Sequence, residues 1–392
     1  MLYYLESLRS TFGPFRLFEY VTFRAGGALL TAMLIVLIFG KPVIGLLKKF
    51  CIANWRYENL LGEQEGEELK KKTPTMGGIL LVAAVLISTL LWGVMNRMLI
   101  IFLCVLCSLC VLGFVDDFIK IRYKRNIRDG VPGKVKMLVQ FLIALSAAYF
   151  LYKTPEAVTM QLYIPFFKDP VIAQPDVDSA QVYLMTPFSE NPLLTLGIAW
   201  TTLFVGIMLV FNGLVVTGTS NAVNLTDGKD GLAAGCLMFC SLAFAAFAYM
   251  SSHAVFAKYL SIPLVPSASE VSVFACAIAG ACIGFLWFNC NPASVFMGDT
   301  GSLPLGGVLG LIAVLIGQQL LLLIVGFVFV MEAVSVILQV YSFKWTGKRI
   351  FRCTPIHHHF EMKGWSENQI VIRFWLIAGI CALLGLATLK LH

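Results

Sequence analysis

The chain has 392 residues, of which 58% are hydrophobic and only 13% are charged, and its mean hydropathy is +0.83. A soluble domain carries roughly 25% charged residues, so the composition excludes an ordinary water-soluble protein and favours an integral membrane protein. The formal net charge of +7 is explained below by the distribution of basic residues between loops, and no nucleic acid is expected as a partner.

Ten apolar segments come close to the roughly 20 residues that a membrane-spanning helix needs. They cover residues 22–40, 76–95, 97–115, 134–152, 193–214, 231–250, 271–288, 302–318, 320–341 and 371–389. No cleavable signal peptide is apparent before the first of them. We therefore expect an all-α integral membrane protein of about ten transmembrane helices, folded as one domain over residues 1–392.

Lysine and arginine are distributed unequally between the two sides of this arrangement. The segments 41–75, 116–136, 215–230, 289–301 and 342–373 carry 21 of the 29 basic residues. The other side, which includes both termini, carries 8. Cytoplasmic loops hold the basic excess, so both termini should be extracytoplasmic. Segment 153–192 is then an extracytoplasmic insertion, for which we expect a small β-hairpin without assigned chemistry.

Basic residues stand directly before the second and fourth apolar segments. Lys72 lies in Lys-Lys-Lys-Thr-Pro-Thr-Met-Gly-Gly (70–78), and Lys134 lies in Gly-Lys-Val-Lys (133–136). Interfacial lysines often only anchor helices against anionic lipid. Lys72 and Lys134 are nearest to the polar motifs, which makes them our candidates for contact with phosphate.

Asp116 and Asp117 end the third apolar segment at the cytoplasmic end of its helix. Adjacent carboxylates repel each other, and a helix C-terminus is itself the negative end of the helix dipole. A Mg²⁺ ion resolves this conflict, because it takes carboxylate oxygens and leaves room for substrate phosphates. A solvated pair neutralised by Lys120, Arg122 and Lys124 is the alternative, and the motif alone leaves both open.

Two polar loops lead into later apolar segments on the same side. They are Asn-Leu-Thr-Asp-Gly-Lys-Asp-Gly (224–231), which contains Asn224, Asp227 and Asp230, and the run 289–302, which contains Asn289, Phe296 and Asp299. Helix N-termini and glycine-rich turns present backbone N–H groups to anions. Asp299 can supply a metal ligand and Phe296 a flat face for a base. Turn and helix-capping roles are the structural alternative for these residues.

Three of the five histidines, His357, His358 and His359, are consecutive in the last cytoplasmic loop. Imidazoles can donate to phosphate or bind a metal. Glu332 stands inside the ninth apolar segment, where a carboxylate is a functional candidate by default. A hydrogen bond that packs two helices is the alternative, so Glu332 is kept outside the core site.

In their order, the motifs Lys-Thr-Pro-Thr-Met-Gly-Gly, Asp-Asp, Asn-Leu-Thr-Asp-Gly, Phe-Met-Gly-Asp-Thr-Gly-Ser and Pro-Ile-His-His-His-Phe-Glu resemble those of the polyprenyl-phosphate N-acetylhexosamine 1-phosphate transferases. The run from Ile350 to Trp375 looks specifically like the branch that transfers phospho-N-acetylmuramoyl-pentapeptide. The resemblance covers nearly the whole chain. It implies a multi-pass protein of the bacterial inner (cytoplasmic) membrane, with ten spans and an active site at the cytoplasmic face.

The resemblance also implies a defined reaction. UDP-N-acetylmuramoyl-pentapeptide and undecaprenyl phosphate would give UMP and lipid I in peptidoglycan synthesis, with Mg²⁺ as the cofactor. A homodimer is a further candidate assembly. Asp116 would either deprotonate the lipid phosphate for direct attack or act as a covalent nucleophile, and the sequence does not choose between these routes.

Carried over position by position, the resemblance assigns roles to individual residues. The catalytic set is Asp116, Asp117, Asp299, His358 and His359, with Asp299 and Asp117 as the metal ligands. The substrate-binding set is Lys72, Lys134, Asn224, Asp227, Asp230, Asn289, Phe296 and His357. The sequence departs from the family pattern at Lys229, where leucine is usual, and in the stretch 122–132, which is longer and more basic.

Two other functions fit parts of the pattern. A sister transferase that uses UDP-N-acetylglucosamine would share the aspartate motifs but should lack the triple histidine. A secondary transporter would also have many spans, but transporters place polar groups near the bilayer midplane and use inverted repeats. Here the acidic residues gather on one side of the predicted membrane, and no repeat relates the two halves of the chain.

Overall fold

The computed structural model describes residues 1–10, 12–50, 73–122, 130–154, 156–164, 170, 172 and 192–389. Within them it is mainly helical, and an isolated β-bridge joins Leu162 to Ile172 in antiparallel fashion. That bridge lies in the predicted extracytoplasmic insertion. The rest of the expected hairpin falls mostly outside the described residues, so the hairpin stays a prediction.

Eight helices among the described residues are long and apolar enough to cross a membrane. They are α1 (Val21–Phe50), α4 (Arg97–Arg122), α5 (Gly133–Tyr152), α7 (Pro192–Thr226), α8 (Leu232–Ser252), α10 (Ala268–Asn289), α13 (Phe327–Thr346) and α15 (Glu367–Thr388). Two shorter apolar helices are α3 (Gly78–Trp92), with 15 residues, and α11 (Asp299–Leu315), with 17. The prediction of an all-helical membrane protein is confirmed, and the count of ten spans stays a prediction.

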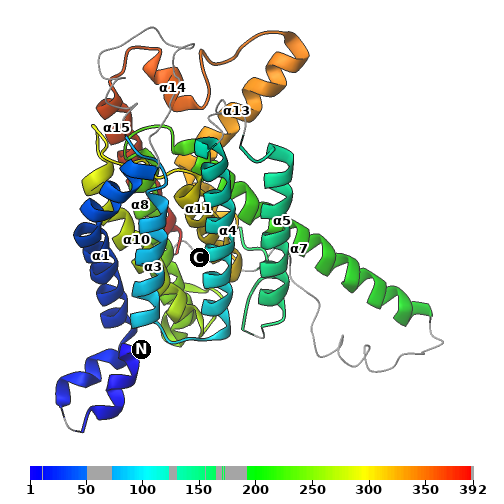
Figure 1. The fold of residues 1–392 in the computed structure, drawn as a ribbon. Helices are drawn as coiled ribbons and strands as arrows, with labels where there is room; N and C mark the ends of the chain where they lie inside the picture. The colour runs from blue at the N-terminus through cyan, green and yellow to red at the C-terminus, as the bar shows by residue number, and fades with distance from the viewer. Residues whose placement is uncertain are drawn as a thin grey trace.

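Short elements complete the fold. The two 3₁₀ helices η1 (Leu2–Leu8) and η2 (Gly13–Glu19) precede α1, and α9 (Ala254–Leu260) follows α8. The ninth predicted segment is divided into α12 (Leu321–Val325) and α13, and α14 (Ile356–Glu361) lies between α13 and α15. In Figure 1, η1 and η2 lie at one end of the bundle and α14 lies at the other.

Helices α10 and α11 form the centre of the bundle. Helix α10 packs between α1 and α8, and α11 packs against α4 and α7 (Figure 1). All 17 residues of α11 are buried, as expected of a helix that is apolar on every side. Because α11 begins at Asp299, the most buried helix of the bundle starts with one of the predicted site residues.

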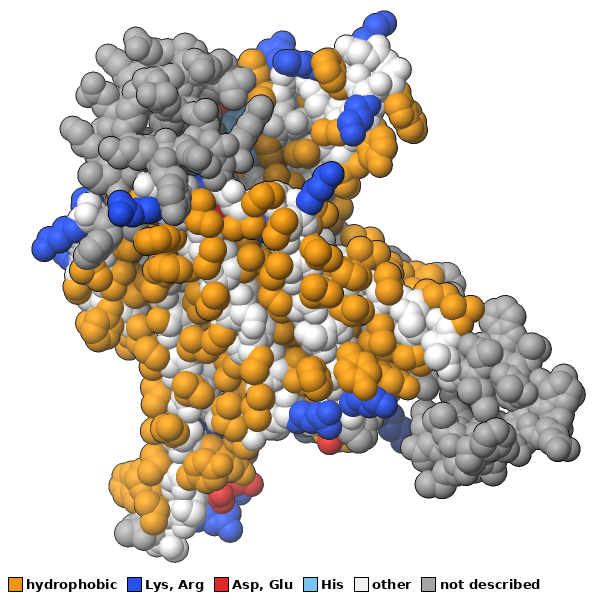
Figure 2. Space-filling view, turned by 45° about the vertical axis from the view of Figure 1, so that its right-hand side comes forward, with side chains coloured by type: hydrophobic (Ala, Val, Ile, Leu, Met, Phe, Trp, Pro, Cys, Tyr) orange, Lys and Arg blue, Asp and Glu red, His pale blue; other side chains and the backbone are white. Residues whose placement is uncertain are grey.

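The outer helices leave large apolar side chains exposed. Leu30 and Ile38 of α1, Leu142 of α5 and Leu383 of α15 are examples. Figure 2 shows hydrophobic side chains covering the flank of the molecule, with Lys and Arg gathered toward its two ends. A continuous apolar surface of this kind is suited to lipid and not to water.

A buried ion pair connects α1 to α10 near η1 and η2. Arg24 of α1 and Glu270 of α10 form two hydrogen bonds of 2.7 Å, Nη1 to Oε2 and Nη2 to Oε1. Glu270 also accepts a 2.7 Å hydrogen bond from the backbone N–H of Val94. Both charges are therefore compensated, which burial requires.

Candidate active site

Asp116 and Asp117 lie in the last turns of α4, beside the first residue of α11. Gly113, one turn earlier in α4, makes this approach possible, because a Cβ atom there would lie 2.2 Å from the backbone carbonyl oxygen of Asp299. The two helices therefore meet backbone against backbone. As a result, carboxylate oxygens of Asp116, Asp117 and Asp299 lie within 4.8 Å of one another. We call these three residues the carboxylate cluster.

Neighbouring donors hold each carboxylate in place. Asp117 Oδ2 accepts hydrogen bonds from the backbone N–H of Thr300 at 3.0 Å and from its hydroxyl at 2.7 Å. Asp299 Oδ1 accepts one from Asn224 Nδ2 at 2.6 Å. Asp116 Oδ1 accepts one from the backbone N–H of Val131 at 2.7 Å. Since Asp299 and Thr300 start α11, the positive end of its dipole also favours the negative charge.

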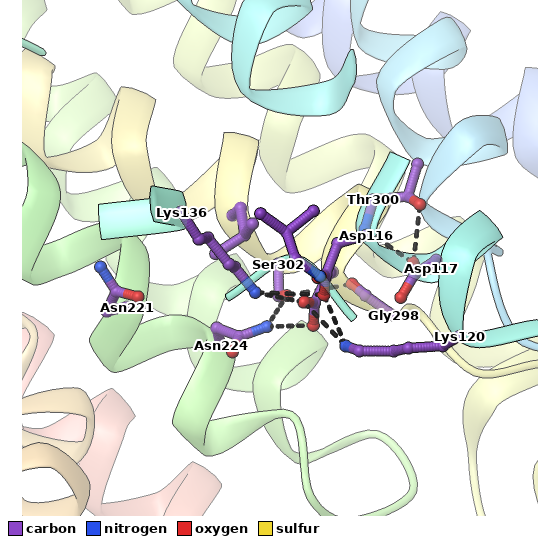
Figure 3. Close-up of polar contacts among 12 residues, drawn as sticks. Asp116, Asp117, Lys120, Lys136, Asn221, Asn224, Gly298, Thr300 and Ser302 are labelled. Carbon is purple, nitrogen blue, oxygen red and sulfur yellow. Dashed lines mark hydrogen bonds and ion pairs between the residues drawn. The ribbon is translucent and has the colours of Figure 1, made fainter. Parts of the chain in front are cut away.

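Two lysines also reach the carboxylate cluster (Figure 3). Lys120 Nζ lies 2.6 Å from Asp116 Oδ2 and 3.1 Å from Asp299 Oδ2. Lys136 Nζ contacts Asp299 Oδ2 and lies 3.4 Å from Asp116 Oδ2. Three carboxylates thus face two ammonium groups in a largely buried place. The donor set consists of carboxylate oxygens, which are the ligands that hard divalent cations prefer, so the cluster fits a metal ion.

Helix α5 presents Lys136 to the cluster, and Lys134, the residue expected from the sequence, is exposed. Residues two positions apart in an α-helix point about 200° apart around its axis. The two lysines at the start of α5 therefore face in nearly opposite directions. The other lysine expected to contact phosphate, Lys72, lies outside the described residues.

The two polar loops are joined to each other by side chains from the predicted substrate-binding set. Asn289 accepts a hydrogen bond from the backbone N–H of Gly231 at 3.0 Å and donates one to the carbonyl of Val295 at 2.8 Å. Asp230 accepts one from the backbone N–H of Ala293 at 3.1 Å. These contacts stabilise turns, which is the structural alternative to substrate binding that the sequence left open for Asn289 and Asp230. They also give the loop before α11 a fixed shape.

Asp227 connects the first polar loop to the start of α11. Its Oδ2 accepts a 3.1 Å hydrogen bond from the backbone N–H of Gly298, the residue before Asp299. Burial and the nearby Asp299 charge raise the pKa of Asp227 well above its usual range, although the Gly298 hydrogen bond acts in the opposite direction. Phe296 is half-buried in the same loop, where its backbone pairs with Pro74 and Gly77.

The three histidines lie together on α14. His357 is buried, and its Nδ1 lies 3.1 Å from Glu332 Oε1. His358 Nδ1 lies 2.9 Å from Glu361 Oε2. His359 Nδ1 accepts a 3.1 Å hydrogen bond from the backbone N–H of Arg352. The partners of His357 and His358 were not identified from the sequence, although Glu332 was noted as an intramembrane carboxylate.

Glu361 joins His358 to Lys229, the residue at which the sequence departs from the family pattern. Lys229 Nζ contacts Glu361 Oε1. Burial acts to raise the pKa of Glu361, but the hydrogen bonds from His358 and Lys229 outweigh it and lower the pKa to about 2. Burial also lowers the pKa of His358 below its usual value, against the effect of the Glu361 hydrogen bond. At neutral pH, Glu361 is therefore charged and His358 is neutral.

The fold and site together define a multi-pass membrane enzyme with an acidic, metal-compatible centre at one end of its helical bundle. The model of glycosyl transferase family 4 matches residues 99–317, and signature 1 of phospho-N-acetylmuramoyl-pentapeptide-transferase matches residues 70–82. The first match contains the carboxylate cluster, and the second ends in α3. The matched segments thus include the carboxylate cluster and the two polar loops, whereas α14 lies outside both.

Full-length relatives agree with these matches. The chain is 44% identical to the phospho-N-acetylmuramoyl-pentapeptide-transferase of Brachyspira hyodysenteriae, 42% to that of Rhodopseudomonas palustris and 40% to that of Methylacidiphilum infernorum. Each comparison covers 100% of both chains. The chain therefore belongs to the phospho-N-acetylmuramoyl-pentapeptide-transferase family. The resemblance found in the sequence is confirmed, and the transporter alternative is set aside.

Proposed function

We propose that the protein transfers phospho-N-acetylmuramoyl-pentapeptide from its UDP derivative to undecaprenyl phosphate, giving lipid I and UMP in the bacterial cytoplasmic membrane. Identity of 40–44% over the full length of relatives with this activity in their names carries the proposal. The cluster of three carboxylates and two lysines supports it, because phosphoryl transfer depends on positioning and charge neutralisation more than on covalent chemistry.

The proposed topology has ten spans, counting α3 and α11, with both termini extracytoplasmic. The basic excess of the loops at the α14 end supports this orientation. The carboxylate cluster would then face the cytoplasm, where a nucleotide-linked substrate is soluble. The lipid substrate would approach through the bilayer along the apolar flank.

Mg²⁺ is the proposed cofactor, held by Asp117 and Asp299, with Asp116 as a third carboxylate within reach. All three offer oxygens in one small region. When bound, Mg²⁺ neutralises charge on the pyrophosphate and makes UMP a better leaving group. Thr300 and Asn224 hold two of these carboxylates through hydrogen bonds, so the ligands are pre-oriented by the protein.

We propose direct transfer in one step. An oxygen of undecaprenyl phosphate forms a bond to the β-phosphorus of the UDP-sugar, and the bond from that phosphorus to the bridging oxygen breaks, so that UMP leaves with the bridging oxygen. Asp116 lies beside both Lys120 and Lys136. A carboxylate paired with two ammonium groups is a weak nucleophile and a weak base. A lipid phosphate that is already a dianion attacks without help from a base, which favours direct transfer, with Asp116 accepting a proton only from a monoanionic lipid phosphate.

The remaining predicted residues belong to the proposal as a substrate-binding region around the cluster. Phe296 would stack on the base, and His359, whose Nδ1 accepts from Arg352, would donate to phosphate or sugar through Nε2. His358, whose Nδ1 faces the Glu361 carboxylate, would donate through Nε2 when it is protonated. The other members are Lys72, Asn224, Asp227, Asp230 and Asn289, and Lys136 takes the part that the sequence assigned to Lys134. A homodimer is the proposed assembly, which the mass of the purified protein in detergent would test.

Release of UMP tests the proposed reaction. Purified protein with Mg²⁺ and undecaprenyl phosphate should release UMP from UDP-N-acetylmuramoyl-pentapeptide and not from UDP-N-acetylglucosamine. Asp299→Asn should lower kcat by about 10²-fold or more, the scale seen when a charge-stabilising group is lost. Glu6→Gln, the same chemical change in η1, should leave kcat unchanged. A preference for UDP-N-acetylglucosamine would indicate the sister transferase, and full turnover by Asp299→Asn would remove that residue from the mechanism.

A further inference from the structure

Glu332 is a completely buried carboxylate in a membrane-spanning helix, and the proposed chemistry does not use it. Its exposed fraction is 0%, and that of His357, which faces it, is also 0%. An isolated carboxylate in an apolar medium is strongly disfavoured unless it is paired or neutralised. The pairing seen here is with His357, whose Nδ1 lies 3.1 Å from Glu332 Oε1.

The ring nitrogen of His357 lies at salt-bridge distance from Oε1, although the two atoms do not meet in hydrogen-bond geometry. The backbone N–H of His357 points to the other carboxylate oxygen, 3.5 Å away. Glu332 therefore attracts both the ring and the backbone of one residue. That residue is in the first turn of α14, so the carboxylate fixes where α14 begins.

The opposite edge of the same imidazole lies against the first polar loop. His357 Nε2 is buried and has no hydrogen-bond partner among the described residues. It packs against Gly228, where a Cβ atom would lie only 2.5 Å from Nε2 and 2.8 Å from Cε1. Only glycine leaves room for the ring at this distance. The imidazole thus lies between Glu332 on one side and the Asp227–Gly228 turn on the other.

This contact connects the intramembrane carboxylate to the reacting centre. Asp227, next to Gly228, holds the backbone of Gly298, and Gly298 immediately precedes Asp299 of the carboxylate cluster. The ring of His358 lies beside that of His357, with centroids 4.2 Å apart and the ring planes tilted by 50°. Movement of His357 would therefore disturb both the start of α11 and the histidine that the proposed function assigns to substrate.

We propose that Glu332 is a positioning residue: its carboxylate holds His357 against Gly228 and so docks α14 against the turn that leads, through Asp227 and Gly298, to the carboxylate cluster. The inference rests on the proposed function, since it concerns the same site. It also gives His357 a role in holding the turn, in place of direct contact with substrate, because the residue is inaccessible. The competing possibility is a helix-packing contact that matters only for stability.

The test compares Glu332→Gln with Glu270→Gln in the full-length protein. Both variants replace a buried carboxylate that faces a basic side chain by an amide of nearly the same shape, but Glu270 pairs with Arg24 at the η1 end of the bundle. We measure kcat and KM for UDP-N-acetylmuramoyl-pentapeptide by UMP release, and Tm in detergent. Glu332→Gln should lower kcat/KM about 10- to 100-fold, as expected for a partner that orients a functional side chain. Glu270→Gln should keep kcat/KM within about twofold, whatever its effect on Tm.

Gly228→Ala tests the same inference from the other side of the imidazole. The added methyl group should displace His357 from the turn and give a fall of similar size, even if Glu332→Gln proves too unstable to assay. Because both changes act through His357, the double variant should lose no more than the worse single variant. Losses that multiply, or a Glu332→Gln or Gly228→Ala variant with unchanged kcat/KM, would overturn the inference. Absence of UMP release by the unaltered protein would instead refute the proposed function.

Discussion

Replacing Gly113 by alanine should separate the catalytic carboxylates without touching any of them. The new Cβ atom would lie 2.2 Å from the carbonyl oxygen of Asp299, whereas an ordinary contact is 3.4–4 Å. The neighbouring atom belongs to the backbone and cannot rotate away, so α4 and α11 must move apart by roughly 1 Å. Overpacking of this kind costs about 1–3 kcal/mol. Alanine's better helix propensity, about 1 kcal/mol, offsets part of that loss.

The effect on catalysis should be much larger than the effect on stability. A misplacement of about 1 Å can cost about 10²-fold in rate, and Gly113→Ala moves Asp116 and Asp117 together, relative to Asp299. We therefore expect kcat/KM for UMP release to fall about 10²-fold, with a well-folded protein in detergent.

Gly26→Ala provides the matched control for this experiment. Gly26 also lies inside a long apolar helix, α1, but no atom lies within 4 Å of its ideal Cβ position. That variant should keep full activity and stability. Wild-type kcat/KM in Gly113→Ala, at unchanged stability, would show that the close approach of α4 and α11 does not set the geometry of the cluster.

Three further predictions follow from the same contacts. Lys136→Gln should lower kcat/KM by about 10-fold or more, whereas Lys134→Gln should not, and equal losses would contradict the orientation of α5. Asp117→Asn should raise the Mg²⁺ concentration needed for half-maximal UMP release by about 10-fold or more, and an unchanged requirement would remove Asp117 from the ligand set. Docking of α14 can be measured by hydrogen exchange of the backbone amides of residues 356–361. It should weaken as the pH falls below about 6.5, because the docked state lowers the pKa of His358. It should weaken again between pH 4.5 and about 2, where Glu361 gains a proton in the undocked state first, and Glu361→Gln should abolish this second step.

The positions of the helices could be predicted from the sequence, because the hydrocarbon layer demands long apolar segments. Each of the ten predicted segments contains a helix. Their ends were predicted less well. Helix α7 continues to Thr226, beyond the predicted end at residue 214, and α4 continues to Arg122, beyond residue 115. A hydropathy pattern ends where polar residues begin, but the backbone hydrogen bonds of a helix continue through them.

The residues of the carboxylate cluster could likewise be predicted from the sequence. Asp116, Asp117 and Asp299 lie at helix ends on the same predicted side of the membrane, and the structure brings all three together. The lysine of α5 that contacts the cluster could not be predicted, because the choice between Lys134 and Lys136 depends on the rotation of α5 about its axis. That rotation follows from packing against α4 and α7, which no single segment reveals. The same holds for Glu332, whose partner is 25 positions away in the chain.

The balance of charge at the cluster explains why two lysines serve the proposed reaction better than three would. Among the described residues, Asp116, Asp117 and Asp299 face Lys120 and Lys136, which leaves one excess negative charge when every group is ionised. A divalent cation turns this into one excess positive charge, which suits a pyrophosphate. A third lysine in contact with these carboxylates would remove the attraction for the metal, and a single one would leave the loaded site without attraction for the substrate. The reversal of sign on metal binding is therefore a property of this particular count of charges, and Lys136→Gln should consequently tighten Mg²⁺ while weakening the UDP-sugar, two opposite changes that titration of each ligand would separate.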